Sequence, residues 1–209
     1  TGPFKFVSYA EGDSIVLEAN ADYVGENKPQ IQDLTFKIYQ TQEAAYTDLV
    51  AGNLDILDSF PPSALAGDTY KNDLGDRYVE QAEGTITTVA YPMYDPKFQS
   101  VDLRRAISQA IDRETIVKNV FNGARIPASG FVSPIVDGYK EGACGDACVY
   151  DPEAAKASLE AAGGYDGILT IASNMDGGHK EWIDATCVSI TNAIGVQCQG
   201  KPYVDFSTY

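Results

Sequence analysis

Residues Val101–Gly123 read VDLRRAISQAIDRETIVKNVFNG, and this stretch predicts two consecutive amphipathic helices. Apolar residues recur every three or four positions along the first helix, which places them on one face. They are Leu103, Ala106, Ile107, Ala110 and Ile111. The second helix repeats the pattern with Ile116, Val117, Val120 and Phe121. Asp112 is placed to cap the second helix and Gly123 to end it, so the stretch is typical of a packed helical layer in a larger scaffold.

The two arginines in this stretch, Arg104 and Arg105, raise three interpretations: a helix that grips phosphate, an acid/base site, or an ordinary polar face. Both lie off the apolar face, and Arg105 is three residues from Asp102, a spacing that gives a weak ion pair on a helix. A structural role is therefore favoured over contact with a ligand or partner. The cluster does not form a catalytic constellation.

Length and charge restrict the class of protein. The chain has 209 residues, enough for one large domain or two small ones, and 44% of them are hydrophobic. Its net charge of −15 disfavours nucleic acid and anionic membranes as partners. No run approaches the roughly 18–20 apolar residues of a membrane-spanning helix. The chain lacks an initiator methionine and a signal peptide, so we expect a processed chain or a piece of a longer protein.

The four cysteines occur as two local pairs, Cys144 with Cys148 and Cys187 with Cys198. An even number with this arrangement favours two disulfides and an oxidising compartment. Reduced structural thiols and a metal site remain alternatives. Neither spacing matches the usual zinc pattern, and the single histidine, His179, is distant from the first pair in the sequence. We therefore expect no metal.

Local patterns predict a succession of strands and helices. In the first part they are a hairpin around residues 11–13, strands over 34–40, 54–57, 77–82 and 85–94, and helices over 41–51 and 61–70. Downstream of the quoted stretch they are a helix over 150–164, a strand over 167–174, a helix over 179–195 and a strand over 196–206. The closing strand–helix–strand order indicates an α/β fold. A shift in composition near residues 75–95 suggests a domain boundary there.

Catalytic motifs are missing from the sequence. The chain has no G-x-S-x-G nucleophile elbow, and its glycine pairs lack the lysine of a phosphate-binding loop. Its carboxylates are too many for a catalytic pair to be singled out, and most belong to a solvated surface. We therefore expect no catalytic residues, no cofactor and no enzyme activity.

The quoted stretch and its flanks, residues 93–134, resemble the middle signature of family 5 extracytoplasmic solute-binding proteins, the oligopeptide-, dipeptide- and nickel-binding subunits of ABC importers. The matching residues are Phe98, Asp102, Arg105, Ala106, Ala110, Ile111, Asp112, Arg113, Ile116, Gly123, Pro127, Ala128 and Gly130. The chain departs from the family at Leu103 and Arg104, where Arg and Val are usual, and at Asp95, near the usual Asn. Residues 1–25, 41–57 and 150–163 are similar to three further family motifs, in the expected order.

The resemblance implies a type II periplasmic-binding-protein-like fold with two lobes, of which this chain is an incomplete central fragment with mixed sheets flanked by helices. Residues 1–84 would form part of the first lobe, and residues 85–209 the crossover and the start of the second. It also implies a monomeric receptor that captures peptides or a similar small solute by lobe closure and delivers them to permease subunits. Its location would be extracytoplasmic, with membrane attachment only through a lipid anchor upstream of Thr1.

Candidate ligand-binding residues follow from the same resemblance. The crossover should line the cleft between the lobes, which makes Thr87, Tyr91 and Tyr94 candidates, and Ser59 and Phe60 form a second group after the 54–57 strand. Core or surface packing is the alternative role for each of them. The family's charged ligand anchors lie beyond Tyr209. Two other functions stay open: a secreted acidic module that docks a protein, and a non-catalytic fragment of a hydrolase.

Overall fold

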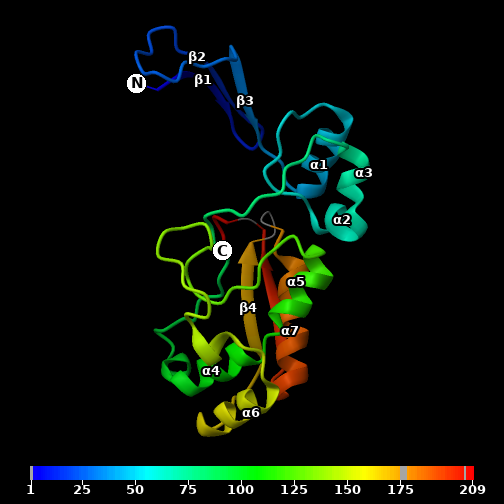
Figure 1. Cartoon of the computed structure of the whole chain (residues 1–209). Helices are drawn as coiled ribbons and strands as arrows, with labels where there is room; N and C mark the ends of the chain where they lie inside the picture. The colour runs from blue at the N-terminus through cyan, green and yellow to red at the C-terminus, as the bar shows by residue number, and fades with distance from the viewer. Residues whose placement is uncertain (1, 175–177, 205) are drawn as a thin grey trace.

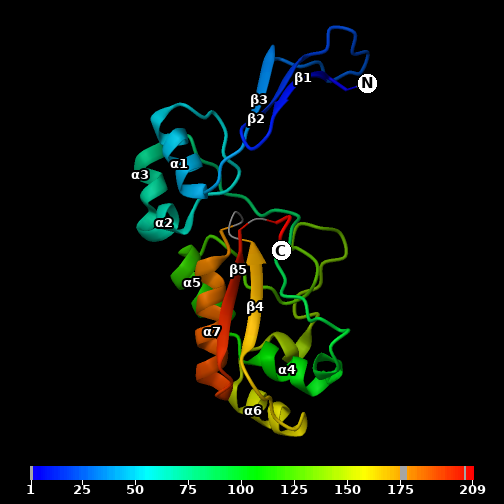
Figure 2. The same cartoon turned by 180° about the vertical axis from the view of Figure 1, so that it is seen from behind.

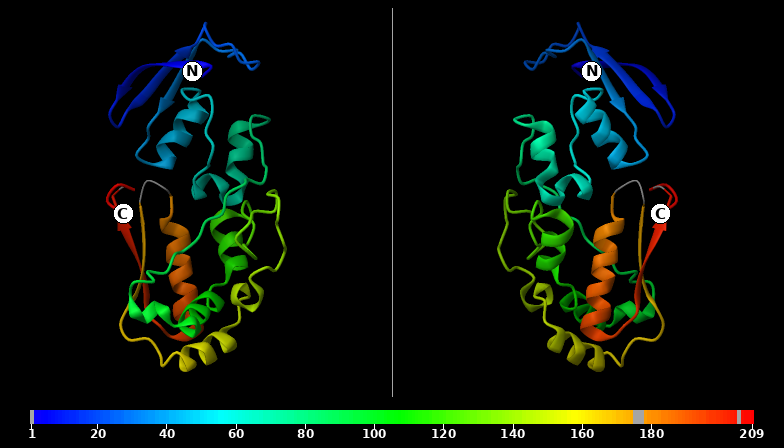
Figure 3. Two further views of the ribbon diagram at one scale, coloured as in Figure 1. Left: turned by 90° about the vertical axis from the view of Figure 1, so that its left-hand side faces the viewer. Right: turned by 90° about the vertical axis from the view of Figure 1, so that its right-hand side faces the viewer.

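A computed structural model describes residues 2–174, 178–204 and 206–209 and shows two bodies joined by an extended segment (Figure 1). The first body comprises residues 2–74 and the second residues 96–209. We call residues 75–95 the linking segment. The molecule is elongated, with the N-terminal sheet at one end and helix α6 at the other (Figure 3). None of the helices in the described parts of the chain has the length and apolar character that crossing a bilayer requires.

The N-terminal sheet is antiparallel, in the order β1 (Phe4–Ala10), β2 (Ser14–Ala19) and β3 (Asp33–Lys37). The predicted hairpin around residues 11–13 is confirmed. Paired residues of adjacent strands share a face, so one row contains Phe6, Leu17 and Leu34 and another Tyr9, Ile15 and Phe36. A bulge between Phe6 and Ser8 shifts the register by one residue. This shift keeps Phe6 and Tyr9 on the same apolar face although they are three residues apart.

Helix α1 (Gln42–Ala51) begins and ends at the residues that the sequence predicts. The hydroxyl of Thr41 accepts a hydrogen bond from the Ala44 backbone N–H at 3.2 Å. Gly52 ends the helix with φ of 79°, a left-handed conformation that glycine adopts without steric cost. The helix buries Ala45 and Leu49.

The carboxylate of Asp48 on α1 ties this helix to the end of the sheet. It lies 2.8 Å from the Lys37 ammonium and accepts hydrogen bonds from the Tyr39 hydroxyl at 2.8 Å and the Asn53 amide at 3.4 Å. These contacts lower the pKa of Asp48 from 3.8 to about 2, and the hydrogen bond with Lys37 has the largest effect. Asp48 therefore favours the folded state while it is ionised.

Because the folded pKa of Asp48 is depressed, its stabilising effect is complete above the unfolded value of 3.8 and is lost as the pH falls towards 2. We expect Asp48→Asn to be less stable than the wild type at pH 6, with the difference shrinking as the pH falls below 3.8 and vanishing below about 2. Unfolding followed by far-ultraviolet circular dichroism across this range measures the difference. A difference that stays constant with pH would refute this role of the ionised carboxylate.

The rest of the first body is a short helical group formed by α2 (Pro62–Leu65), η1 (Ala66–Asp68) and α3 (Thr69–Leu74). The predicted helix over 61–70 is thus interrupted, because Gly67 and Asp68 both adopt positive φ. Its small core contains Leu49, Ala64, Tyr70 and Leu74. Edge-on and tilted ring contacts add Tyr46, Phe60 and Tyr78 to this core.

Three predicted strands are wrong. Residues 54–57, 77–82 and 85–94 are not strands in the structure, and Ile56 is 83% exposed. Their alternating or β-branched sequences favour extended backbone, but within the described residues no neighbouring strand pairs with them. Without a partner strand the backbone groups have no ladder to join, and residues 81–90 are exposed throughout.

The second body is an α/β unit. Its helical elements are η2 (Pro96–Gln99), α4 (Val101–Gln109), α5 (Arg113–Phe121), η3 (Gly145–Cys148), α6 (Pro152–Ala161) and α7 (Lys180–Ile194). Strands β4 (Leu169–Asn174) and β5 (Cys198–Tyr203) pair in parallel, and α7 connects them along one face (Figure 2). The predicted strand–helix–strand order is confirmed.

The second body has its own core, which shares no residue with the first. It is built on α7, whose Ile190 is fully buried and Ile183 nearly so. The predicted apolar face of α4 supplies Leu103, Ile107 and Ala110. The predicted disulfide Cys187–Cys198 is present and joins α7 to β5 across a Cα–Cα distance of 4.8 Å. The second predicted disulfide, Cys144–Cys148, is also present.

Of the two arginines, Arg104 has a structural role. Its guanidinium donates to the backbone carbonyls of Phe98 at 2.6 Å and Gln99 at 3.1 Å, and so anchors η2 to α4. Arg105 is exposed. The predicted ion pair between Arg105 and Asp102 is not among those that the described residues form, since solvated side chains gain little by holding such a geometry.

Candidate functional site

The linking segment and the ends of the parallel strands define the candidate site. Strands β4 and β5 end at Asn174 and Tyr203, and both point towards the first body (Figure 2). In α/β proteins ligands bind beyond the carboxyl ends of the strands, where backbone groups and loops are available. The linking segment passes the same region on its way between the bodies (Figure 2).

The predicted residues of the linking segment have two different environments. Thr87 is exposed and Tyr94 is 89% exposed, so both side chains are available to a ligand. Tyr91 is half-buried against the core of the second body, and its hydroxyl donates to the Arg104 carbonyl at 3.1 Å. Burial raises the pKa of Tyr91 to about 12, so it remains a protonated donor at neutral pH. Tyr91 thus anchors the linking segment to the second body.

The second predicted group, Ser59 and Phe60, precedes α2. Ser59 is half-buried. The ring of Phe60 packs against Tyr46 and Tyr70, with centroids 5.6 Å and 5.4 Å apart. Its side chain therefore serves the core of the first body. Within the described residues, no hydrogen bond or ring contact joins this pair to Thr87, Tyr91 or Tyr94.

A long irregular loop, residues 124–150, supports the linking segment from the second body. The Ser133 hydroxyl donates to the Glu83 carbonyl at 2.5 Å, and Val136 lies beside Gly84. The loop exposes several apolar side chains, which are Ile126, Phe131, Ile135 and Val136. The sequence signal for this contact is weak, because the two segments are fifty residues apart.

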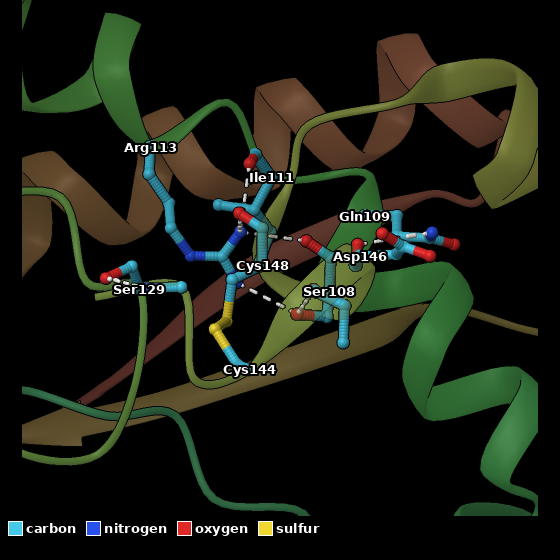
Figure 4. Close-up of a disulfide and its surroundings, with 10 residues drawn as sticks. Ser108, Gln109, Ile111, Arg113, Ser129, Cys144, Asp146 and Cys148 are labelled. Atoms are coloured by element: carbon cyan, nitrogen blue, oxygen red, sulfur yellow. Dashed lines mark hydrogen bonds between the residues drawn. A yellow bond between two sulfur atoms is a disulfide. The ribbon is translucent and has the colours of Figure 1, made fainter. Parts of the chain in front are cut away.

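The disulfide Cys144–Cys148 holds the end of this loop, and polar side chains of α4 and α5 fix it to the core (Figure 4). The Ser108 hydroxyl donates to the Ala147 carbonyl at 2.5 Å, and the Gln109 amide to the Asp146 carbonyl at 3.3 Å. In both contacts the loop supplies a backbone carbonyl as the acceptor.

The guanidinium of Arg113 completes this network. It donates to the Ser108 hydroxyl at 2.9 Å and to the carbonyls of Ser108, at 3.0 Å, and Cys148, at 3.4 Å (Figure 4). Burial lowers the pKa of Arg113, and the nearby Tyr91 opposes that shift. Arg113 therefore positions the loop and the start of α5, a role that the family signature does not reveal by itself.

The two bodies also meet at a polar junction that sequence reasoning missed. Asp68 of the first body accepts a hydrogen bond from the Asn122 amide of the second at 3.1 Å. A small cavity of about 110 Å³ adjoins this contact, and its lining includes Lys71 and Glu80. No local sequence pattern predicts a contact between two residues that are 54 positions apart.

Comparison with known proteins accounts for this architecture. The family described as "Bacterial extracellular solute-binding proteins, family 5 Middle" matches residues 1–209. The dipeptide-binding protein of Escherichia coli (strain K12) is 29% identical over 163 residues, which cover 78% of this chain and 30% of that protein. The oligopeptide-binding protein OppA of Bacillus subtilis (strain 168) is 30% identical over 167 residues, 76% of this chain and 29% of that protein. The chain thus spans about a third of the length of these relatives.

Solved structures agree in fold. The Escherichia coli murein tripeptide binding protein MppA aligns with a TM-score of 0.81 at 23% identity, covering 100% of this chain and 42% of that one. The Bacillus subtilis oligopeptide-binding protein AppA, solved with a nonapeptide, aligns with a TM-score of 0.75 at 23% identity over 99% of this chain and 42% of that one. The predicted mixed α/β fold of the type II periplasmic-binding class is confirmed. The chain belongs to family 5 of the bacterial extracellular solute-binding proteins.

Proposed function

We propose that this chain is the central part of a receptor that captures peptides outside the cytoplasmic membrane for an ABC importer. The observation that carries the proposal is the family match over all 209 residues, together with relatives named for binding dipeptides and oligopeptides. The separate cores and the extended link between them suit a protein that works by moving two bodies against each other.

In this proposal the ligand lies against the linking segment, beyond the carboxyl ends of β4 and β5. Thr87 and Tyr94 contact it directly through exposed side chains, and Ser59 contributes from the first body. Tyr91 and Phe60 contribute indirectly, because they hold in place the backbone that carries the contact residues. Closure excludes water, which makes each hydrogen bond to the peptide count for more. The charged anchors for the peptide termini belong to polypeptide beyond Tyr209.

The partners and the location follow from the same role. We propose that the closed receptor docks on permease subunits and acts as a monomer, with a lipid anchor upstream of Thr1 as its membrane attachment. The two disulfides support an oxidising compartment. The peptide is released unchanged, so no turnover accompanies binding.

Thermal unfolding of the intact protein with candidate solutes tests this function. A dipeptide or tripeptide present at 100 times its dissociation constant should add about 2.7 kcal/mol to the free energy of unfolding, whereas sugars and metal chelates should add nothing. No shift with any peptide, combined with stable binding of a protein partner, would favour the interaction module instead. Cleavage of the added peptide would favour a hydrolase.

A variant pair tests where the peptide lies. Tyr94→Ala should weaken peptide affinity roughly tenfold, because aromatic contact residues carry much of the energy of an interface. Tyr9→Ala is the matched control, since Tyr9 is also exposed but belongs to the N-terminal sheet. Titration calorimetry measures both affinities, and equal values for the two variants would remove Tyr94 from the site.

A further inference from the structure

The junction between the bodies contains an unusual backbone conformation on each side. Asp68 and Asn122 have φ of 59° and 49°, and in the described parts of the chain they are the two non-glycine residues with positive φ. The left-handed region is disfavoured for residues with a side chain, although Asp and Asn tolerate it better than most. A left-handed residue held in place by its surroundings often marks a functional position.

These two residues contact each other. The Asn122 amide nitrogen donates to the Asp68 carboxylate at 3.1 Å. Asn122 is the C-terminal cap of α5 in the second body, whereas Asp68 stands at the kink between η1 and α3 in the first. Each left-handed residue therefore ends or begins a helix at the place where the two bodies approach, and α2 lies next to α5 in both views (Figures 1 and 2).

The Asp68 carboxylate also forms an ion pair within the first body. The Lys71 ammonium lies 3.2 Å from the Asp68 carboxylate and 3.7 Å from that of Glu80, which belongs to the linking segment. The Tyr70 hydroxyl also donates to Glu80. Asp68 is thus fixed to α3 and, through Lys71, to the start of the linking segment.

Within the described residues, the other contacts between the bodies include α2 lying against α5 and Gln42 lying beside Gly178. The cavity of about 110 Å³ beside the hydrogen bond is bordered by Leu65 and Phe121, so the apolar side chains there leave a space between them. A small, polar and incompletely packed contact between two bodies permits relative motion. Individual hydrogen bonds then decide how the bodies are placed.

We propose that Asp68 and Asn122 form an interlobe latch that restrains the relative motion of the two bodies. Its role in lobe closure rests on the proposed function, but the restraint itself requires no ligand. A single hydrogen bond of this kind changes the equilibrium between arrangements roughly two- to tenfold, which suits a contact that must form and break during binding.

The test is the distribution of distances between spin labels on the two bodies of the ligand-free protein. Asn72→Cys on α3 and Lys118→Cys on α5 provide exposed labelling positions near the latch, and the native cysteines are paired in disulfides. We expect the distribution to be at least roughly twofold broader in Asp68→Gly and in Asn122→Gly. Glycine accepts the left-handed backbone, so these variants remove the side chains without adding strain.

Two further variants separate the latch from general effects on folding. Asp68→Asn keeps an oxygen that accepts from Asn122 and loses the ion pair with Lys71, so it should retain the narrow distribution. Asn119→Ala changes an exposed residue of the same helix and should also have no effect. Unchanged widths in both glycine variants, or an Asp68→Asn variant as broad as Asp68→Gly, would overturn the latch.

Adding a tripeptide to the same samples tests the proposed function separately. If the peptide has no effect but the distance distribution is broader in the glycine variants, the latch is supported and the proposed function is refuted. If the peptide binds but the distance distributions of the wild type and the glycine variants are equally broad, the proposed function is supported and the latch is refuted.

Discussion

Replacing Ile190 by alanine should lower the free energy of unfolding of the second body by about 2–5 kcal/mol. Ile190 is fully buried on α7, in the core that α4 and strand β4 also line. Alanine loses the transfer free energy of three carbon atoms and leaves a cavity that the tightly packed neighbours fill only in part. Urea unfolding followed by the fluorescence of Trp182 measures this change, because the single tryptophan lies on the same helix.

Val188→Ala is the matched control. Val188 is also a β-branched residue of α7, but it is 59% exposed. Its replacement should change the free energy of unfolding by no more than about 0.5 kcal/mol. Similar losses of the free energy of unfolding in the two variants would contradict the structure, in which Ile190 faces the core and Val188 faces solvent.

Removal of the Cys187–Cys198 disulfide is the second large effect. The double variant Cys187→Ala/Cys198→Ala should lose about 2–3 kcal/mol of the free energy of unfolding, because the bridge joins residues 11 apart in the unfolded chain. Cys187 is buried in the core, so β5 also loses its covalent attachment to α7. The same Trp182 fluorescence measurement applies.

The Cys144–Cys148 bridge supplies the comparison. It joins residues 4 apart in the sequence, so its removal should cost less, about 2 kcal/mol or below. Its neighbours also keep their hydrogen bonds to the loop carbonyls through Ser108, Gln109 and Arg113. A greater loss at this bridge than at Cys187–Cys198 would contradict the roles assigned here.

The sequence predicts the helices of this protein well because their signals are local. Thr41 and Asp112 lie within three residues of the N–H groups that they cap, and the apolar spacing of α4 shows which side is buried. The parallel strands are also predictable, because they flank a helix in the order strand–helix–strand. Such features depend on neighbours in the chain.

The strands predicted at 54–57, 77–82 and 85–94 fail for the opposite reason. Extended backbone becomes a strand only when another segment pairs with it, and the composition of a segment does not contain that information. The linking segment has the residues of a strand and an extended course, but within the described residues no strand pairs with it.

The candidate site is partly visible in the sequence. The family signature directs attention to Thr87, Tyr91 and Tyr94, but only the structure shows that Tyr91 turns into the core while Tyr94 faces solvent. An extended segment has no fixed face until a body packs against it. The Asp68–Asn122 contact is hidden altogether, because it depends on how two separately folded parts meet.

The central claim is that two bodies close over a peptide, and an interbody distance tests it most directly. Labels at Thr35→Cys on β3 and Glu141→Cys in the 124–150 loop occupy exposed positions on the first and second bodies. In the intact protein, addition of a saturating tripeptide should shift their distance distribution to shorter values. A distribution that stays unchanged while calorimetry on the same sample records peptide binding would contradict closure.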